Sequence, residues 1–144
     1  MTTTSAAVYV RDKRYFVHAY SITVKGIAVA SDPFFAVESK AGDESLGAAV
    51  ESALMKSSTE VPDLPASARH DAPLLKLAKV RSWREFMRGA KYLAVVRSGK
   101  DISIERWDND GFRTFEPSES PAAALNNPSK AALGARIREI LAEA

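Results

Sequence analysis

The sequence contains no cysteine. This excludes a disulfide scaffold, a thiolate nucleophile and metal centres with cysteine ligands. It also lacks any apolar run near the roughly 18 to 20 residues that a membrane span needs, and its N-terminus has no apolar core of signal-peptide length behind a basic lead. We therefore expect a cytoplasmic protein without a membrane partner.

The motifs of common enzyme classes are missing as well. The sequence has no G-x-S-x-G elbow, no G-x-x-x-x-G-K-[ST] phosphate loop and no G-x-G-x-x-G turn. Of its two histidines, His18 lies in a predicted strand and is expected to have a structural role, and His70 lies beside Asp71 in a predicted loop, where adjacent side chains rarely face one another. The turn at 107–111, WDNDG, lacks the glutamate that closes a calcium loop. We expect no enzyme activity, no metal and no cofactor.

Charges of opposite sign are nearly balanced. The 144 residues include 20 lysines and arginines and 18 acidic residues, and 46% are hydrophobic. The length corresponds to one domain with a self-sufficient core, and the net charge of +2 does not support a nucleic-acid partner.

Strand and helix signals alternate along the chain. Short runs rich in β-branched and aromatic residues, separated by turn signals, predict two meander-like groups of mainly antiparallel strands. Residues 31–33 are expected to interrupt two short strands, and residues 117–128 are expected to form a proline- and asparagine-rich loop. Apolar stripes at helical spacing predict four helices, at about 43–56, 73–79, 82–90 and 129–143. The predicted fold class is α+β, with a disordered leader at 1–7 and a single domain at 8–144; whether the strands form one sheet or two stays open.

The third predicted helix has the clearest local signal. Ser82 followed by Glu85 forms a capping box, in which the serine hydroxyl accepts from a free amide and the glutamate reaches back. Trp83, Phe86 and Met87 then fall on one apolar face, which predicts that this helix contributes to the core.

Two other helices share a short motif. Residues 46–50, LGAAV, match residues 133–137, LGARI. Because glycine in a helix costs about 1 kcal/mol relative to alanine, Gly47 and Gly134 are expected to mark places where each helix approaches the sheet closely. Chance similarity and duplication are equally compatible with the match.

The strand at 102–107 ends in a possible partner-binding surface. Alternation places Trp107 with Ser103 and Glu105 on a solvent-facing side, although burial against a loop is an equal alternative. Tryptophan and arginine dominate binding hot spots. The predicted partner-binding residues are Arg106, Trp107, Asp108, Asp110 and Phe112.

A longer pattern resembles a known family. The segments PLLKLAKVRSWREFMRGAKYLAVV, DISIER, LGARIREIL and DESLGAAVESAL together resemble the immunity proteins of bacterial contact-dependent growth inhibition systems, over roughly residues 32–141. The resemblance implies a cytosolic antitoxin that binds the C-terminal toxin domain of a cognate effector, often a nuclease, and blocks its active site. A monomer bound to the toxin is the favoured assembly, while the oligomeric state stays open. Inhibitors of basic nucleases tend to be acidic, whereas this chain is slightly basic, so the toxin's activity stays open.

A second hypothesis starts from the basic residues at 76–100. Together with a sheet, this segment could form a small nucleic-acid-binding module, with Trp83 and Tyr92 as stacking surfaces. An ordinary solvated face is the simpler interpretation of the same charges.

Overall fold

The computed structural model describes residues 3–23, 28–57, 72–109, 115–117 and 123–143. These residues form a mainly antiparallel sheet with four helices, which confirms the predicted α+β class. The strands are β1 (Thr3–Arg11), β2 (Arg14–Ile22), β3 (Ala28–Glu38), β4 (Lys91–Ser98), β5 (Asp101–Asn109), β6 (Phe115–Pro117) and β7 (Ala123–Asn126). The helices are α1 (Asp43–Lys56), α2 (Ala72–Ala78), α3 (Trp83–Met87) and α4 (Lys130–Glu143).

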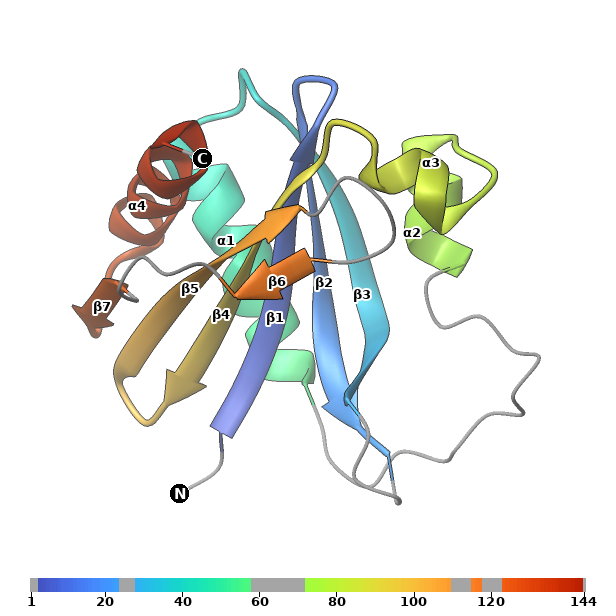
Figure 1. Ribbon diagram of the computed structural model, residues 1–144. Helices are drawn as coiled ribbons and strands as arrows, with labels where there is room; N and C mark the ends of the chain where they lie inside the picture. The colour runs from blue at the N-terminus through green and yellow to red at the C-terminus, as the bar shows by residue number, and fades with distance from the viewer. Residues whose placement is uncertain (1–2, 24–27, 58–71, 110–114, 118–122, 144) are drawn as a thin grey trace.

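The two predicted meanders join into a single sheet. Its strand order is β3-β2-β1-β4-β5-β6, and β7 pairs with another stretch of β5 (Figure 1). The junction is the antiparallel pair of β1 and β4, in register from Thr3 opposite Ser98 to Val10 opposite Lys91. Both β1 and β4 are therefore interior strands.

The expectation of a disordered leader at 1–7 is wrong for the residues that the structure describes. Thr3 to Ala7 belong to β1, and the side chains of Ala6 and Ala7 are 0% exposed. This segment lies between β2 and β4 and is covered on both faces, where small side chains fit. Residues 1 and 2 lie outside the described ranges.

Two predicted irregular segments lie within strands. The turn expected at Ser31 to Pro33 is an irregularity inside β3, where Ser31 pairs with Ala19 and Phe34 with His18, so that Asp32 and Pro33 have no partners in the register. Because β3 is an edge strand, proline is tolerated there. Part of the loop expected at 117–128 is β7, where Ile102 pairs with Leu125.

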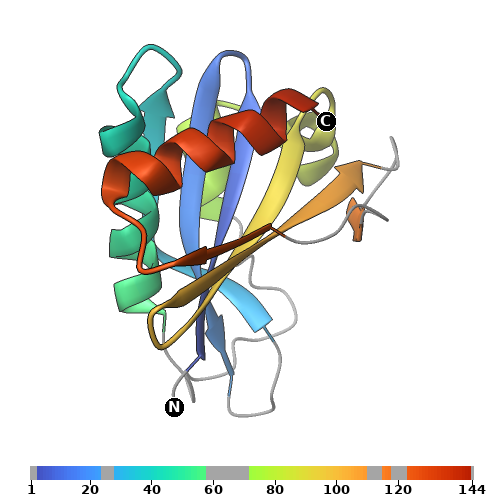
Figure 2. The ribbon, with the colours of Figure 1, turned by 90° about the vertical axis from the view of Figure 1, so that its left-hand side faces the viewer.

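Helices cover both faces of the sheet. In Figure 2, α1 and α4 lie on one side and the α2–α3 layer lies behind the sheet. Along β1, Ala6 and Val8 pack with α1 and α4, whereas Ala7 and Tyr9 pack with α2 and α3. This alternation explains why consecutive residues are buried in β1 and β2, as expected for strands covered on both faces.

The predicted helices are recovered, with one shorter than expected. The cap of α3 is confirmed, because Ser82 Oγ accepts a hydrogen bond from the Glu85 amide at 3.1 Å. The Glu85 carboxylate accepts instead from the Arg81 amide, at 3.0 Å. The helix predicted to reach residue 90 ends at Met87, because Arg88 is extended and Gly89 has a φ of +79°.

The shared glycine motif places α1 against α4, so the expectation that each glycine approaches the sheet is wrong. A Cβ added to Gly47 would lie 1.8 Å from the backbone oxygen of Lys130, and one added to Gly134 would lie 1.9 Å from that of Asp43. Each glycine thus admits the first turn of the other helix. This reciprocal contact gives both LGA motifs the same packing role, whatever their origin.

Arg138 fastens α4 to the turn between β3 and α1. Its guanidinium donates to the carbonyl oxygens of Ser39, at 2.8 Å, and Ala41, and it forms a 2.8 Å ion pair with Asp43. It also lies over the Tyr15 ring, 5.1 Å from the centroid. A planar fork of donors suits such a set of partners.

Candidate functional site

Two of the predicted partner-binding residues, Arg106 and Trp107, lie on opposite faces of the sheet. Arg106 and Trp107 are consecutive residues of β5, and successive side chains of a strand point to opposite faces. Since Ile104 packs in the α1–α4 core, Arg106 lies on that face, whereas Trp107 packs against the cluster beneath α2 and α3. The side chain of Asp108, and all of Asp110 and Phe112, lie outside the described residues.

Trp107 is half-buried on the α2–α3 side of the sheet. Its ring centroid lies 5.9 Å from that of Tyr92. The indole Nε1 is buried and has no hydrogen-bond partner among the described residues. A buried indole N–H normally finds an acceptor, and none of the described residues supplies one to Trp107.

An aromatic cluster continues from Trp107 towards α3. The centroid of the Tyr9 ring lies 4.9 Å from the ring centroid of Tyr92, 5.1 Å from that of Phe86 and 6.1 Å from that of Trp83. Trp83 and Trp107 are both only partly buried, at the margins of this core. The row therefore connects β5 with α3 on one side of the molecule.

His18 belongs to the same buried cluster. The side chain is 1% exposed, its Nε2 lies 3.3 Å from the Tyr9 hydroxyl, and its Nδ1 lies 2.9 Å from the Ala19 carbonyl oxygen. A proton on Nδ1 satisfies both contacts, because Nδ1–H then donates to the carbonyl while Nε2 accepts from tyrosine. This geometry fits the structural role expected for His18; His70 lies outside the described residues.

Two tyrosines close the cluster. The hydroxyls of Tyr20 and Tyr92 lie 2.8 Å apart. Burial raises the pKa of both phenols, and the nearby Tyr20 and Glu105 raise that of Tyr92 further. Both phenols therefore stay neutral near pH 7. No group of three or more His, Cys, Asp or Glu in the described ranges could hold a metal ion.

The basic segment 76–100 separates into distinct parts. Lys91 Nζ donates to the carbonyl oxygen of Leu141, at 3.2 Å, and Arg97 Nε donates to that of Gly99 in its own hairpin, also at 3.2 Å. Lys100 is exposed in the same hairpin as Arg97. The other cations gather on α2, α3 and the turns beside them, and all are exposed: Lys76, Lys79, Arg81, Arg84 and Arg88. We call these five residues the cationic surface.

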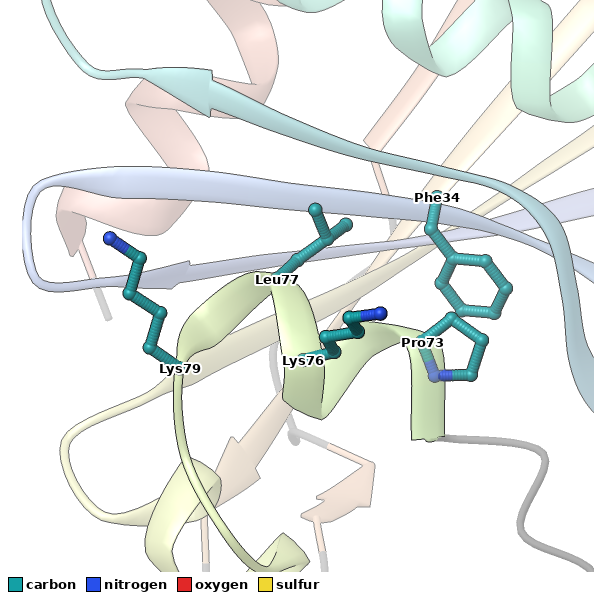
Figure 3. A pocket seen from close by; sticks show the side chains of 5 residues that line it. All are labelled: Phe34, Pro73, Lys76, Leu77 and Lys79. Carbon is teal, nitrogen blue, oxygen red and sulfur yellow. The ribbon is translucent and has the colours of Figure 1, made fainter.

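A cavity of about 500 Å³ adjoins this surface. Phe34 of β3 and Pro73 and Leu77 of α2 supply apolar walls, and Lys76 and Lys79 complete the lining (Figure 3). Sequence reasoning missed this site, because Phe34 and Leu77 are far apart in the chain. A run of lysines beside prolines and leucines carried no signal of a cavity.

Similarity to known structures extends over the whole chain. No protein-family model matches the sequence, and no curated protein matches it. A protein of unknown function from Neisseria meningitidis has a TM-score of 0.81 at 15% identity, with 99% of this chain and 95% of that chain covered. A chain of the CdiA-CT/CdiI toxin and immunity complex from Yersinia pseudotuberculosis has a TM-score of 0.80 at 16% identity, with 99% and 97% covered. At these identities the likeness shows a shared fold.

None of the helices in the described part of the chain is long and apolar enough to cross a membrane.

Proposed function

We propose that this chain is an immunity protein of a contact-dependent growth inhibition system. In this role it binds, in the cytoplasm and as a monomer, the C-terminal toxin domain of a cognate effector and neutralises it without turnover. The observation that carries the proposal is the fold likeness, over 99% of the chain, to a chain of a toxin and immunity complex. The sequence resemblance points to the same class independently.

Neutralisation would work by occlusion of the toxin's active site. An interface of standard size buries about 1,600 Å² in total, and complementary charge speeds association and fixes the partner's orientation. Within this proposal Trp107 acts as an anchor. Its ring is half-buried at the margin of the aromatic cluster and leaves apolar area for a partner, as the tryptophans of binding hot spots commonly do. The sequence resemblance implies an effector that is often a nuclease, and we propose that activity for the toxin domain.

Co-expression tests the proposal directly. The C-terminal domain of the large secreted protein encoded upstream is expressed in a sensitive host, with or without this chain. Growth should be rescued only when the chain is present, and the two purified proteins should form a complex with a Kd in the nanomolar range or below. An upstream region without such a protein, or a toxin domain whose lethality this chain leaves unchanged, would contradict the function.

A matched pair of variants tests the anchor. Trp107→Ala should weaken toxin binding by about tenfold or more, as hot-spot truncations do. Met55→Ala removes a side chain that is 76% exposed at the end of α1, on the opposite side of the sheet, and should leave binding unchanged. Equal effects of the two variants would remove Trp107 from the interface.

A further inference from the structure

The cationic surface concentrates positive charge in a chain that is almost neutral overall. The segment 72–90 contains these five cations and one carboxylate, that of Glu85, whereas the whole chain has 20 basic and 18 acidic residues. The Glu85 carboxylate is already engaged by the Arg81 amide. None of the five cations forms an ion pair with another residue of the described ranges. Their field is therefore available to a partner.

The adjoining cavity adds apolar recognition to this charge. In Figure 3 the Phe34 ring stands beside Pro73, the Lys76 amine lies on the same side, and Lys79 extends beyond the end of α2. An apolar hollow with ammonium groups beside it matches an aromatic or aliphatic side chain flanked by carboxylates.

Lys79 lies in a conformation that favours glycine. Its φ is +60°, at the end of α2, where its amide donates to the Lys76 carbonyl and the Val80 amide donates to that of Leu75. Glycine is the usual residue at such a helix end because it has no Cβ. A lysine there contributes to the lining of the cavity at a conformational cost.

We propose that the cationic surface and this cavity bind an acidic polypeptide segment of the toxin, with one apolar side chain of that segment inside the cavity. This inference rests on the proposed function and specifies the partner's chemistry. The surface lies on the same side of the sheet as Trp107, whose ring packs against the cluster that α2 and α3 cover. One partner could therefore contact both, and the toxin surface that docks here is acidic.

A nucleic acid fits this surface less well. Single strands bind through bases stacked on open aromatic faces as well as through phosphate contacts. Here the Trp83 ring stacks on Phe86, at 5.5 Å and 22°. Among the described residues the large exposed hydrophobic side chain is Met55, on the far side of the sheet. The strands β1, β2 and β4 are covered on both faces and offer no open platform.

Fluorescence anisotropy with three labelled peptides tests the inference on the full chain at low ionic strength. The first peptide carries one phenylalanine between pairs of glutamates, the second has glutamines in place of the glutamates, and the third has glycine in place of the phenylalanine. We expect saturable binding of the first, about tenfold weaker binding of the second, and weaker binding of the third. No saturable binding of the first peptide, or equal binding of the first two, overturns the proposal.

Charge variants locate the binding site. Lys76→Glu/Lys79→Glu should abolish binding, whereas Lys100→Glu/Lys130→Glu makes the same change in net charge at two exposed lysines elsewhere and should leave it intact. Lys79→Gly removes a cation while relieving the positive φ, so a loss of affinity in this variant cannot arise from unfolding. Equal losses in the two double variants would show diffuse attraction and overturn the site. Tighter binding of a single-stranded DNA at the same salt concentration would overturn the choice of a polypeptide.

The purified toxin domain separates this inference from the proposed function. If wild-type chain binds the toxin and Lys76→Glu/Lys79→Glu binds it equally well, the inference fails and the function stands. If wild-type chain binds the acidic peptide but not the toxin, the immunity function fails while the acidic-ligand site stands, although its occupant is then another protein. If the wild-type chain binds the toxin and Lys76→Glu/Lys79→Glu does not, the result supports both the immunity function and the acidic-ligand site.

Discussion

Replacing Gly47 with alanine should destabilise this protein, although the same change stabilises most helices. The new Cβ would lie 1.8 Å from the backbone oxygen of Lys130, whereas Cβ atoms essentially never approach another atom closer than 3.0 Å. The first turns of α1 and α4 must therefore separate by about 1.2 Å. A backbone oxygen cannot rotate away as the end of a flexible side chain can, so the strain falls on the packing of the two helices.

The magnitude follows from two opposing terms. Alanine gains about 1 kcal/mol in helix propensity over glycine. Overpacking a tight contact costs about 1 to 3 kcal/mol and sometimes more, and the separation also loosens Leu46 and Leu133, both fully buried between the helices and the sheet. We expect the clash to dominate, with a net loss of about 2 kcal/mol in the free energy of unfolding.

Urea unfolding followed by far-ultraviolet circular dichroism measures this loss. Gly42→Ala is the control, because no atom lies within 4 Å of the added Cβ and its φ of −67° suits alanine. Its effect should stay within about 1 kcal/mol, the cost of alanine in place of glycine at the N-cap of α1. Gly134→Ala should behave like Gly47→Ala, since its Cβ would lie 1.9 Å from the Asp43 oxygen. In the double variant one separation relieves both clashes, so the loss should be smaller than the sum. A more stable Gly47→Ala variant, or fully additive losses, would refute the reasoning.

Three further predictions concern other contacts. Arg138→Lys should lower the free energy of unfolding by about 2 kcal/mol in urea, because one ammonium cannot replace a fork that holds two carbonyls and Asp43; unchanged stability would contradict this role. In the folded state burial raises the pKa of Tyr20 and Tyr92 above the value of about 10 that tyrosine has in the unfolded chain. Their contribution to the free energy of unfolding is therefore complete below about pH 10 and is lost as the pH rises above it. Thermal unfolding at rising pH should show this loss of stability, and the loss should be smaller in the Tyr20→Phe/Tyr92→Phe variant. An equal loss in the wild-type chain and in the variant would assign it to other groups. Ser82→Ala should lower the free energy of unfolding by about 1 kcal/mol, whereas Ser82→Asp should change it little, because aspartate can also cap a helix. Equal losses in the two variants would show that the cap does not stabilise α3.

Local patterns predicted the helices well because their causes are local. The stripe in 133–141 and the serine cap of α3 involve residues a few positions apart, and both appear in the structure. The strands at 3–7 and 123–126 were missed because their stability comes from partners distant in the chain. Ala6 has little strand propensity, yet it lies in an interior strand between β2 and β4.

The candidate site divides in the same way. The composition of 106–112 drew attention to Trp107, but strand alternation sends Arg106 and Trp107 to opposite faces, each with a different core. The charges of the cationic surface are visible in the sequence, whereas the cavity beside them depends on the approach of Phe34 to α2. The sequence shows which residue types are present, but it does not show which distant residues lie beside them in the fold.

The sequence by itself determined the α+β class, the four amphipathic helices and the absence of cysteine chemistry, since composition and short-range periodicity are properties of the chain alone. Only the tertiary structure decided that β1 pairs with β4 to make one sheet, that Gly47 and Gly134 receive each other's helix, and that an apolar cavity adjoins the cations. The physical reason is that these features arise where distant segments meet. Which segments meet depends on how every apolar surface of the chain is buried at once.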